Sequence, residues 1–197
     1  MIRPSRLSVL ACAALLAGCS LMSRSPPLAV RYFSPEPARQ TASETHAHQS
    51  AKLALGALTS SANLGNRIVH RESPVEVGVY ETLRWTETPD AYVHRALVRA
   101  LFEQRPIEQT LEGDAPVLDV ELVAFEVLRQ DNSWAARVEL RYRLHDEHAV
   151  LARGVVTVLQ PAPGASFDGA VTAVGQAMNA AANKVAADVA SRLSPPP

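Results

Sequence analysis

The clearest pattern along the chain is a strict alternation of apolar and charged residues between Trp134 and His145. Such an alternation predicts a β-strand with one buried face and one solvated face, because successive side chains of a strand point to opposite sides. The apolar positions are Ala136, Val138, Leu140, Tyr142 and Leu144, and the charged positions are Arg137, Glu139, Arg141 and Arg143.

Two neighbouring segments extend this strand into a hairpin or meander. Residues 117–129 place Leu118, Val120 and Leu122 on one face and then shift phase at 123–125, which predicts a bulge or a strand buried on both sides. Residues 149–160 run back after a turn at 146–148. Further strands are predicted over 28–34, 52–59, 67–71 and 75–80, and 36–50 is interpreted as an exposed loop.

Two segments instead repeat apolar residues every three or four positions, as amphipathic helices do. The first is predicted to be capped by Asp90 and to run to about Gln104, with Arg95 and Arg99 facing water. The second spans about 168–192 and is rich in alanine; its apolar stripe comprises Val171, Val174, Met178, Ala181, Val185 and Val189. The sequence therefore predicts a single α/β (α+β-like) domain, a mixed sheet of about five to six strands packed by two main helices.

The N-terminus has the organisation of an export signal. Arg3 and Arg6 precede an uncharged apolar run over 7–17, which is too short to span a bilayer. The run closes on Leu16-Ala17-Gly18-Cys19, which resembles the bacterial lipobox. This motif predicts cleavage between Gly18 and Cys19 and lipid attachment at Cys19, as S-diacylglycerol and N-acyl (palmitate) chains. The weaker alternative is an ordinary secretory signal with a chance cysteine.

These features divide the chain into a signal peptide (1–18), a lipidated tether (19–27), a domain (28–193) and a tail (194–197). Cys12 would leave with the signal peptide and Cys19 would be acylated, so the mature chain would contain no thiol and no disulfide. Residue 20 is serine rather than aspartate. By resemblance to Gram-negative sorting, this favours the periplasmic face of the outer membrane over the inner membrane.

Composition and motifs limit the classes of function that the protein can have. The formal net charge is −1, which argues against a nucleic-acid partner. Catalytic motifs are absent from the sequence: there is no Gly-x-Ser-x-Gly and no glycine-rich phosphate loop. We therefore expect no enzyme activity, no catalytic residue, no cofactor and no metal. The histidine pairs His46/His48 and His145/His148 lack a third ligand nearby in sequence, and solvated loop histidines are the favoured interpretation.

Three further residue sets have a functional and a plain structural interpretation. The row Arg137, Arg141, Arg143 could meet acidic head groups or an acidic partner, but the wet side of a sheet is favoured. The scattered carboxylates (Glu72, Glu76, Glu81, Glu87, Asp90) are interpreted as a solvated face. Trp85 and Trp134 could be interface anchors, and a core or rim role is at least as well supported.

The order of several short motifs resembles a known family. After the lipobox come Val30-Arg31-Tyr32-Phe33, then Ile68-Val69-His70-Arg71, then Val77-Gly78-Val79-Tyr80-Glu81, and Trp85 before Pro89. One helix, three strands and a C-terminal helix follow. This order resembles the ABC-type transport auxiliary lipoproteins (PqiC-like) over roughly 30–193. His70 departs from the family pattern, in which many relatives carry an aromatic residue.

The resemblance implies a non-enzymatic lipoprotein of an MCE/ABC-type intermembrane lipid transport system, with an MCE-family periplasmic protein as partner and the membrane contacted through the lipid anchor. It would dock the periplasmic assembly at the outer membrane. It leaves open whether the domain forms a homo-oligomer. The alternative functions are a structural or assembly lipoprotein that supports an outer-membrane protein complex and, with less support, a periplasmic hydrolase.

Overall fold

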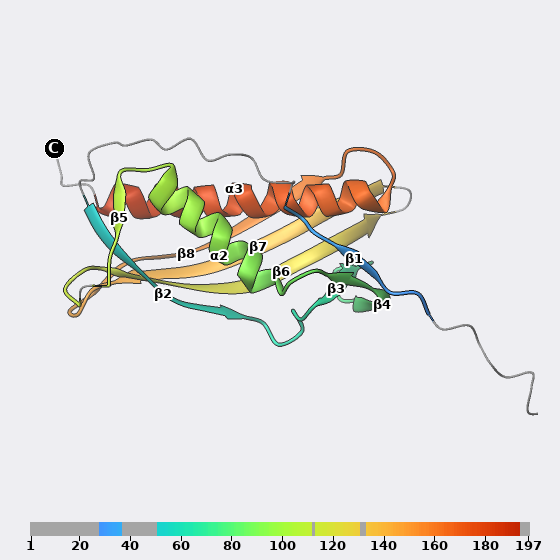
Figure 1. Cartoon of the computed structure of the whole chain (residues 1–197), viewed down its shortest axis with the longest axis horizontal. Helices are drawn as coiled ribbons and strands as arrows, with labels where there is room; N and C mark the ends of the chain where they lie inside the picture. Colours follow the sequence, from blue (N-terminus) through green and yellow to red (C-terminus); the bar gives the residue numbers. More distant parts are fainter. Residues whose placement is uncertain (1–27, 37–50, 112, 131–132, 194–197) are drawn as a thin grey trace, which may run out of the picture.

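The computed structural model describes residues 28–36, 51–111, 113–130 and 133–193 of the 197-residue chain. In this part, eight strands form one mixed sheet, and two helices lie on one of its faces (Figure 1). The predicted fold class is confirmed, with more strands than the five to six expected. The strands are β1 (Arg31–Phe33), β2 (Ala51–Ser60), β3 (Arg67–Arg71), β4 (Val77–Trp85), β5 (Ile107–Gln109), β6 (Val117–Gln130), β7 (Ser133–His145) and β8 (Val150–Pro161).

Strand β6 organises the sheet because both of its edges are paired. On one edge it forms an antiparallel hairpin with β7, which in turn pairs with β8, as the meander prediction required. On the other edge, β2 runs parallel to its first half and β3 runs parallel to its second half. The predicted bulge is confirmed by a register shift between Leu122 and Ala124.

The helices are α2 (Pro89–Val98), which continues as a π-helical turn η1 (Arg99–Glu103), and α3 (Phe167–Leu193). Helix α3 packs on β7 and β8, while α2 packs on α3 and β2. The predicted stripe of α3 is buried throughout, from Val171 to Val189. Because most side chains on that stripe are alanine or valine, the helix can approach the sheet closely.

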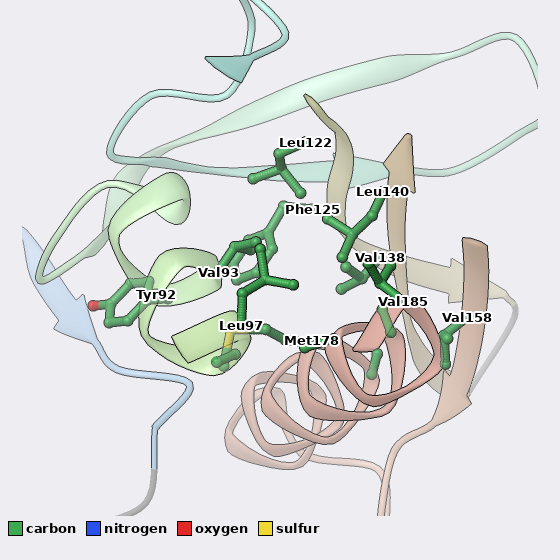
Figure 2. Close-up of a cluster of buried hydrophobic side chains, with 14 of the residues drawn as sticks. Tyr92, Val93, Leu97, Leu122, Phe125, Val138, Leu140, Val158, Met178 and Val185 are labelled. Atoms are coloured by element: carbon green, nitrogen blue, oxygen red, sulfur yellow. The ribbon is translucent and has the colours of Figure 1, made fainter. Parts of the chain in front are cut away.

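The core fills the space between the helices and the sheet face beneath them (Figure 2). The inward set of β7 is confirmed: Val138 and Leu140 are fully buried and meet Met178 and Val185 of α3 in one cluster. Phe125 lies in the same cluster and contacts Trp85 edge to face, with ring centroids 5.4 Å apart. Trp85 is therefore a core residue, and the interface-anchor alternative for it is wrong.

The first helix begins differently from the prediction. Thr88 occupies the N-cap position and Pro89 is the first helical residue, whereas Asp90 lies in the first turn. The physical reason is that proline has a fixed φ suited to a helix start and lacks an N–H that would be unpaired there in any case. The negative charge of Asp90 still acts favourably on the helix dipole.

Three strands differ from the sequence prediction. Strand β4 continues to Trp85 instead of ending at Tyr80, because its second half pairs with β1. The first strand is shorter, at three residues, and the short strand β5, which pairs with β2, was not predicted. Residues 37–50, most of the predicted loop, lie outside the described residues.

One glycine on α3 determines how the segment after β1 lies on the helix. A Cβ atom added at Gly175 would collide with the carbonyl oxygen of Pro35, which is buried against the helix. No larger residue fits there without moving one of the two backbones. Gly175 therefore allows the close approach of residues 34–36 to α3.

We predict that Gly175→Ala lowers the free energy of unfolding by about 1–3 kcal/mol, because overpacking outweighs the higher helix propensity of alanine. Urea denaturation measures the effect. The matched control is Gly65→Ala, where an added Cβ meets nothing within 4 Å. A Gly175→Ala protein as stable as the parent would contradict the close approach.

Candidate docking surface

The sheet face opposite the helices is covered by neither helix and bears paired charges of both signs. Residues on this face of β6 and β7 stand directly opposite each other in the register: Asp119 faces Arg143, and Glu121 faces Arg141. The ion pairs measure 2.8 Å from Arg143 Nη2 to Asp119 Oδ2 and 2.6 Å from Arg141 Nη1 to Glu121 Oε2. The arginine row predicted from the sequence therefore lies on the wet face, as favoured, and its charges are largely neutralised.

Further along β6, this face contains a buried ion pair. Glu126 is only 3% exposed and accepts two hydrogen bonds of 2.9 Å from Arg71 of β3. Arg137 of β7 lies 3.4 Å from the same carboxylate and also binds Glu139. A bidentate arginine satisfies a buried carboxylate well, so this pair connects three adjacent strands.

Asp119 is the most connected acid on this face. Its Oδ1 accepts a 3.0 Å hydrogen bond from the Ala57 N–H, at the point where β2 shifts register, and its Oδ2 lies 3.2 Å from His145 Nε2. Burial raises the pKa of Asp119, but the hydrogen bonds from Arg143, Ala57 and His145 more than offset this and lower the pKa below its ordinary value.

A shallow hollow of about 560 Å³ opens over these residues. Strands β2, β6, β7 and β8 contribute its lining, which includes Ala57, Thr59, Asp119, Glu121, Arg141, Arg143, Arg153 and Val155. Arg153 is exposed and makes no ion pair within the described residues. Val155 is 56% exposed next to it. We call this set the charged hollow.

A tyrosine lies at the base of the charged hollow and connects the sheet to α3. The Tyr142 hydroxyl donates a 2.6 Å hydrogen bond to Asp188 Oδ2. Burial and this carboxylate raise the pKa of Tyr142 to about 12. Its β8 neighbour is Gly154, where an added Cβ would lie 2.6 Å from the hydroxyl. Glycine thus leaves room for the ring to lie across β8.

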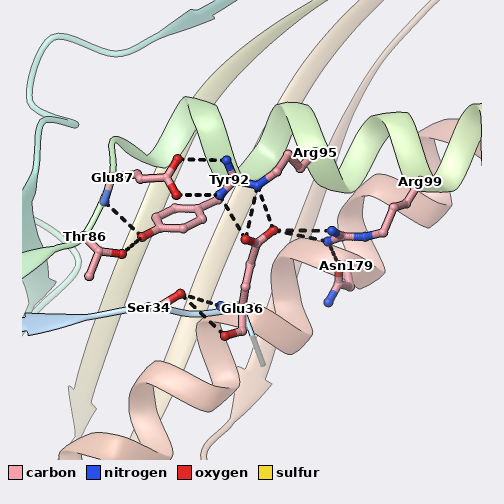
Figure 3. Close-up of polar contacts among 8 residues, drawn as sticks. All are labelled: Ser34, Glu36, Thr86, Glu87, Tyr92, Arg95, Arg99 and Asn179. Atoms are coloured by element: carbon pink, nitrogen blue, oxygen red, sulfur yellow. Dashed lines mark hydrogen bonds and ion pairs between the residues drawn. The ribbon is translucent and has the colours of Figure 1, made fainter. Parts of the chain in front are cut away.

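A second polar cluster attaches the N-terminal segment to the helices (Figure 3). Glu36 follows β1 and binds Arg95 of α2 at 2.9 Å and Arg99 at 3.4 Å. Arg99 also reaches Asn179 of α3, and Arg95 binds Glu87 at 2.8 Å. Both arginine side chains are 37% exposed, so they lie partly in water as predicted. The prediction missed their common partner Glu36, which is 59 and 63 residues away in the chain.

The other predicted residues divide into two groups. Gly18 and Cys19, the predicted cleavage and lipid-attachment positions, lie outside the described residues, as do His46 and His48. His145 binds Asp119. In the described part, no three His, Cys, Asp or Glu residues are arranged to hold a metal ion. Trp134 is partly buried and contacts Phe167 of α3.

Sequence reasoning missed two sets of residues. The pairing of Asp119 with Arg143 had a signal: each alternates with apolar residues along its predicted strand, and only the hairpin register was lacking. The roles of Glu36 and Arg153 had no signal in the sequence. The partners of Glu36 are distant in sequence, and the surroundings of Arg153 come from three other strands.

Comparison with known proteins identifies the family. The family model described as "ABC-type transport auxiliary lipoprotein component" matches residues 33–186, most of the chain. The chain belongs to this family. No curated protein matches it. Solved structures of low sequence identity share the fold. One is protein XCC0632 from Xanthomonas campestris, at 20% identity and a TM-score of 0.70, covering 83% of this chain and 96% of that one.

A second similar structure is the hypothetical protein CT253 from Chlamydia trachomatis, at 11% identity and a TM-score of 0.54. The match covers 73% of this chain and 98% of that chain. These structural similarities support the fold. The family match confirms the family resemblance that the order of the sequence motifs indicated. Within the described residues, no helix combines the length and the apolarity that a bilayer crossing requires.

We predict that Asp119 makes the protein sensitive to acid. Because its pKa is lower in the folded state, its stabilising contribution is present above the ordinary carboxyl pKa of 3.8 and is lost as the pH falls through the lower folded value. Asp119→Asn should lower the free energy of unfolding at pH 7 by about 1–3 kcal/mol and flatten the decline below pH 4.

Urea denaturation at pH 7, 5 and 3 measures both effects. The matched control is Glu121→Gln on the same strand face, whose pair with Arg141 is more exposed and should change stability by less than about 0.5 kcal/mol. An Asn variant with the acid-side decline of the parent would show that Asp119 is not responsible for it.

Proposed function

We propose that this auxiliary lipoprotein holds the periplasmic MCE assembly of an ABC-type lipid transporter at the outer membrane, without catalysing a reaction. The observation that carries the proposal is the family match, because it assigns the chain to lipoproteins that accompany ABC transporters. The lipobox at 16–19 supports anchoring at Cys19, and Ser20 supports the outer membrane. The chain would then divide into signal peptide 1–18, tether 19–27, domain 28–193 and tail 194–197.

The geometry supports the charged hollow as the docking position. It lies on the sheet face that the helices leave uncovered, beside the exposed side chain of Val155. Its arginines 141 and 143 are neutralised by neighbouring carboxylates, so Arg153 provides the net positive charge. A partner surface with an acidic residue opposite Arg153 and an apolar residue opposite Val155 would complement it.

The Glu36 cluster fits an anchored protein. Within the described residues, the N-terminal segment pairs with the sheet through the three residues of β1, which is a small attachment for a chain that would continue to a membrane anchor. Glu36 adds ion pairs to α2, and Pro35 packs on Gly175 of α3. Both the sheet and the helices would therefore hold the N-terminal segment at the point where the tether joins the domain.

We predict that Arg153→Glu weakens binding of the MCE partner about tenfold, because reversal of one interfacial charge costs roughly 1.4 kcal/mol. Affinity purification from detergent-solubilised envelopes should recover an MCE protein with the parent, and less with the variant. Lys184→Glu, on the exposed side of α3, is the matched control and should bind as the parent does. Repeated recovery of an outer-membrane protein complex in place of an MCE protein would favour the assembly-lipoprotein alternative.

We also predict that Cys19→Ser abolishes processing and removes the protein from the outer-membrane fraction. The variant lacks the residue at which the acyl chains attach, and stable attachment requires more than one such chain. Mass spectrometry of the parent protein should find a chain that begins at Cys19 with acyl chains attached, and density-gradient fractionation should place it with the outer membrane. An unmodified or uncleaved N-terminus would contradict the anchor.

A further inference from the structure

Exposed apolar side chains gather at one end of the molecule. Within the described residues, six of the eleven exposed large apolar residues lie on β1, on the segment leading into it, on β4, or on the β3–β4 turn. We call these the apolar end patch: Leu28 (71% exposed), Val30 (45%), Tyr32 (64%), Val75 (92%), Val77 (43%) and Val79 (39%). A gathering of exposed apolar side chains on a water-facing protein indicates a contact with another apolar surface.

Strand pairing places the patch residues of β1 and β4 on the sheet face opposite the helices. Phe33 points inward and contacts Phe167 of α3, with ring centroids 5.0 Å apart, so its neighbour Tyr32 points to the other side. Val79 is paired with Val69, which is paired in turn with Glu126 on the open face. Register partners share a face, so Val79 projects there as well.

The patch and the charged hollow lie toward opposite ends of the sheet. Strand β3 pairs with the last third of β6, at residues 126–128, whereas the hollow is built on residues 119–121 of the same strand. Figure 1 shows β1, β3 and β4 together toward one end of the molecule and β5 at the other end.

The length of the tether confines this end of the molecule. Leu28 is the first described residue, nine residues after Cys19. An extended chain spans at most about 3.3–3.6 Å per residue, so Leu28 stays within about 30 Å of an acylated Cys19. The hollow lies beside residues 119–121 of β6, away from the strands that follow Leu28.

We propose that the apolar end patch inserts into the interfacial region of the bilayer that holds the acylated Cys19, an inference that rests on the proposed anchor. Tethering keeps the patch at a high effective concentration near lipid, so modest apolar contacts suffice. Exposed charges of both signs surround the patch, Arg31 and Arg67 against Glu76 and Glu81. The contact is therefore apolar rather than a recognition of anionic head groups, and it turns the charged hollow away from the membrane.

The test uses the full chain, processed in cells and reconstituted into vesicles of phosphatidylethanolamine and phosphatidylglycerol. Val79→Cys introduces the only free thiol once Cys12 is removed and Cys19 is acylated, and it receives an NBD fluorophore. Val150→Cys is the matched control: Val150 is 55% exposed and is paired with His145 beside the β7–β8 turn, at the opposite end of β6. Mass spectrometry of the same samples reports acylation of Cys19.

We expect nitroxide-bearing lipids to quench the label at position 79 roughly twofold or more relative to position 150, because interfacial contacts reach about 5–10 Å into the head-group boundary. Its emission should also shift to shorter wavelength. Equal quenching at both positions in acylated, vesicle-bound protein would overturn the inference while leaving the anchor intact. A label shielded from aqueous iodide but untouched by the nitroxide would assign the patch to a protein partner and overturn it too. Unacylated Cys19 would overturn both proposals.

Discussion

The structure depends on the burial of one sheet face beneath α2 and α3. The apolar residues of β6 and β7 alternate with charged ones, so only one face offers a continuous apolar surface, and both helices pack there. Because the helices cover only one face of these long strands, the opposite face is available for contacts with other molecules. Both proposed contacts of this protein, with a partner and with a bilayer, use that face.

The open face tolerates exposure because its charges are paired. Asp119 and Glu121 on β6 stand opposite arginines on β7, and the buried Glu126 is satisfied by Arg71 from β3. An exposed pair such as that of Glu121 with Arg141 adds little to stability. Together the paired charges give the face a nearly neutral surface, on which an unmatched residue such as Arg153 would select the proposed partner.

The two ends of the sheet differ because its two edges are built differently. The β6–β7–β8 meander continues to the β7–β8 turn and supports the charged hollow, whereas β3, β4 and β1 form a separate group beside the last third of β6. The N-terminal chain joins that group through β1, and Glu36 and Pro35 attach it to the helices. In an anchored protein, this arrangement would direct the apolar end toward the membrane and the hollow toward the periplasm.

The sequence by itself determined the meander, the bulge near residue 123, the stripe of α3 and the membership of the family, because each depends on periodicity or on motif order within short segments. Tertiary structure alone decided that Arg95 and Arg99 bind Glu36, that Trp85 is buried, and that Arg153 borders a hollow. These outcomes could not be read from local patterns, because each joins residues from separate elements whose pairing is set by which apolar face is buried and in what register.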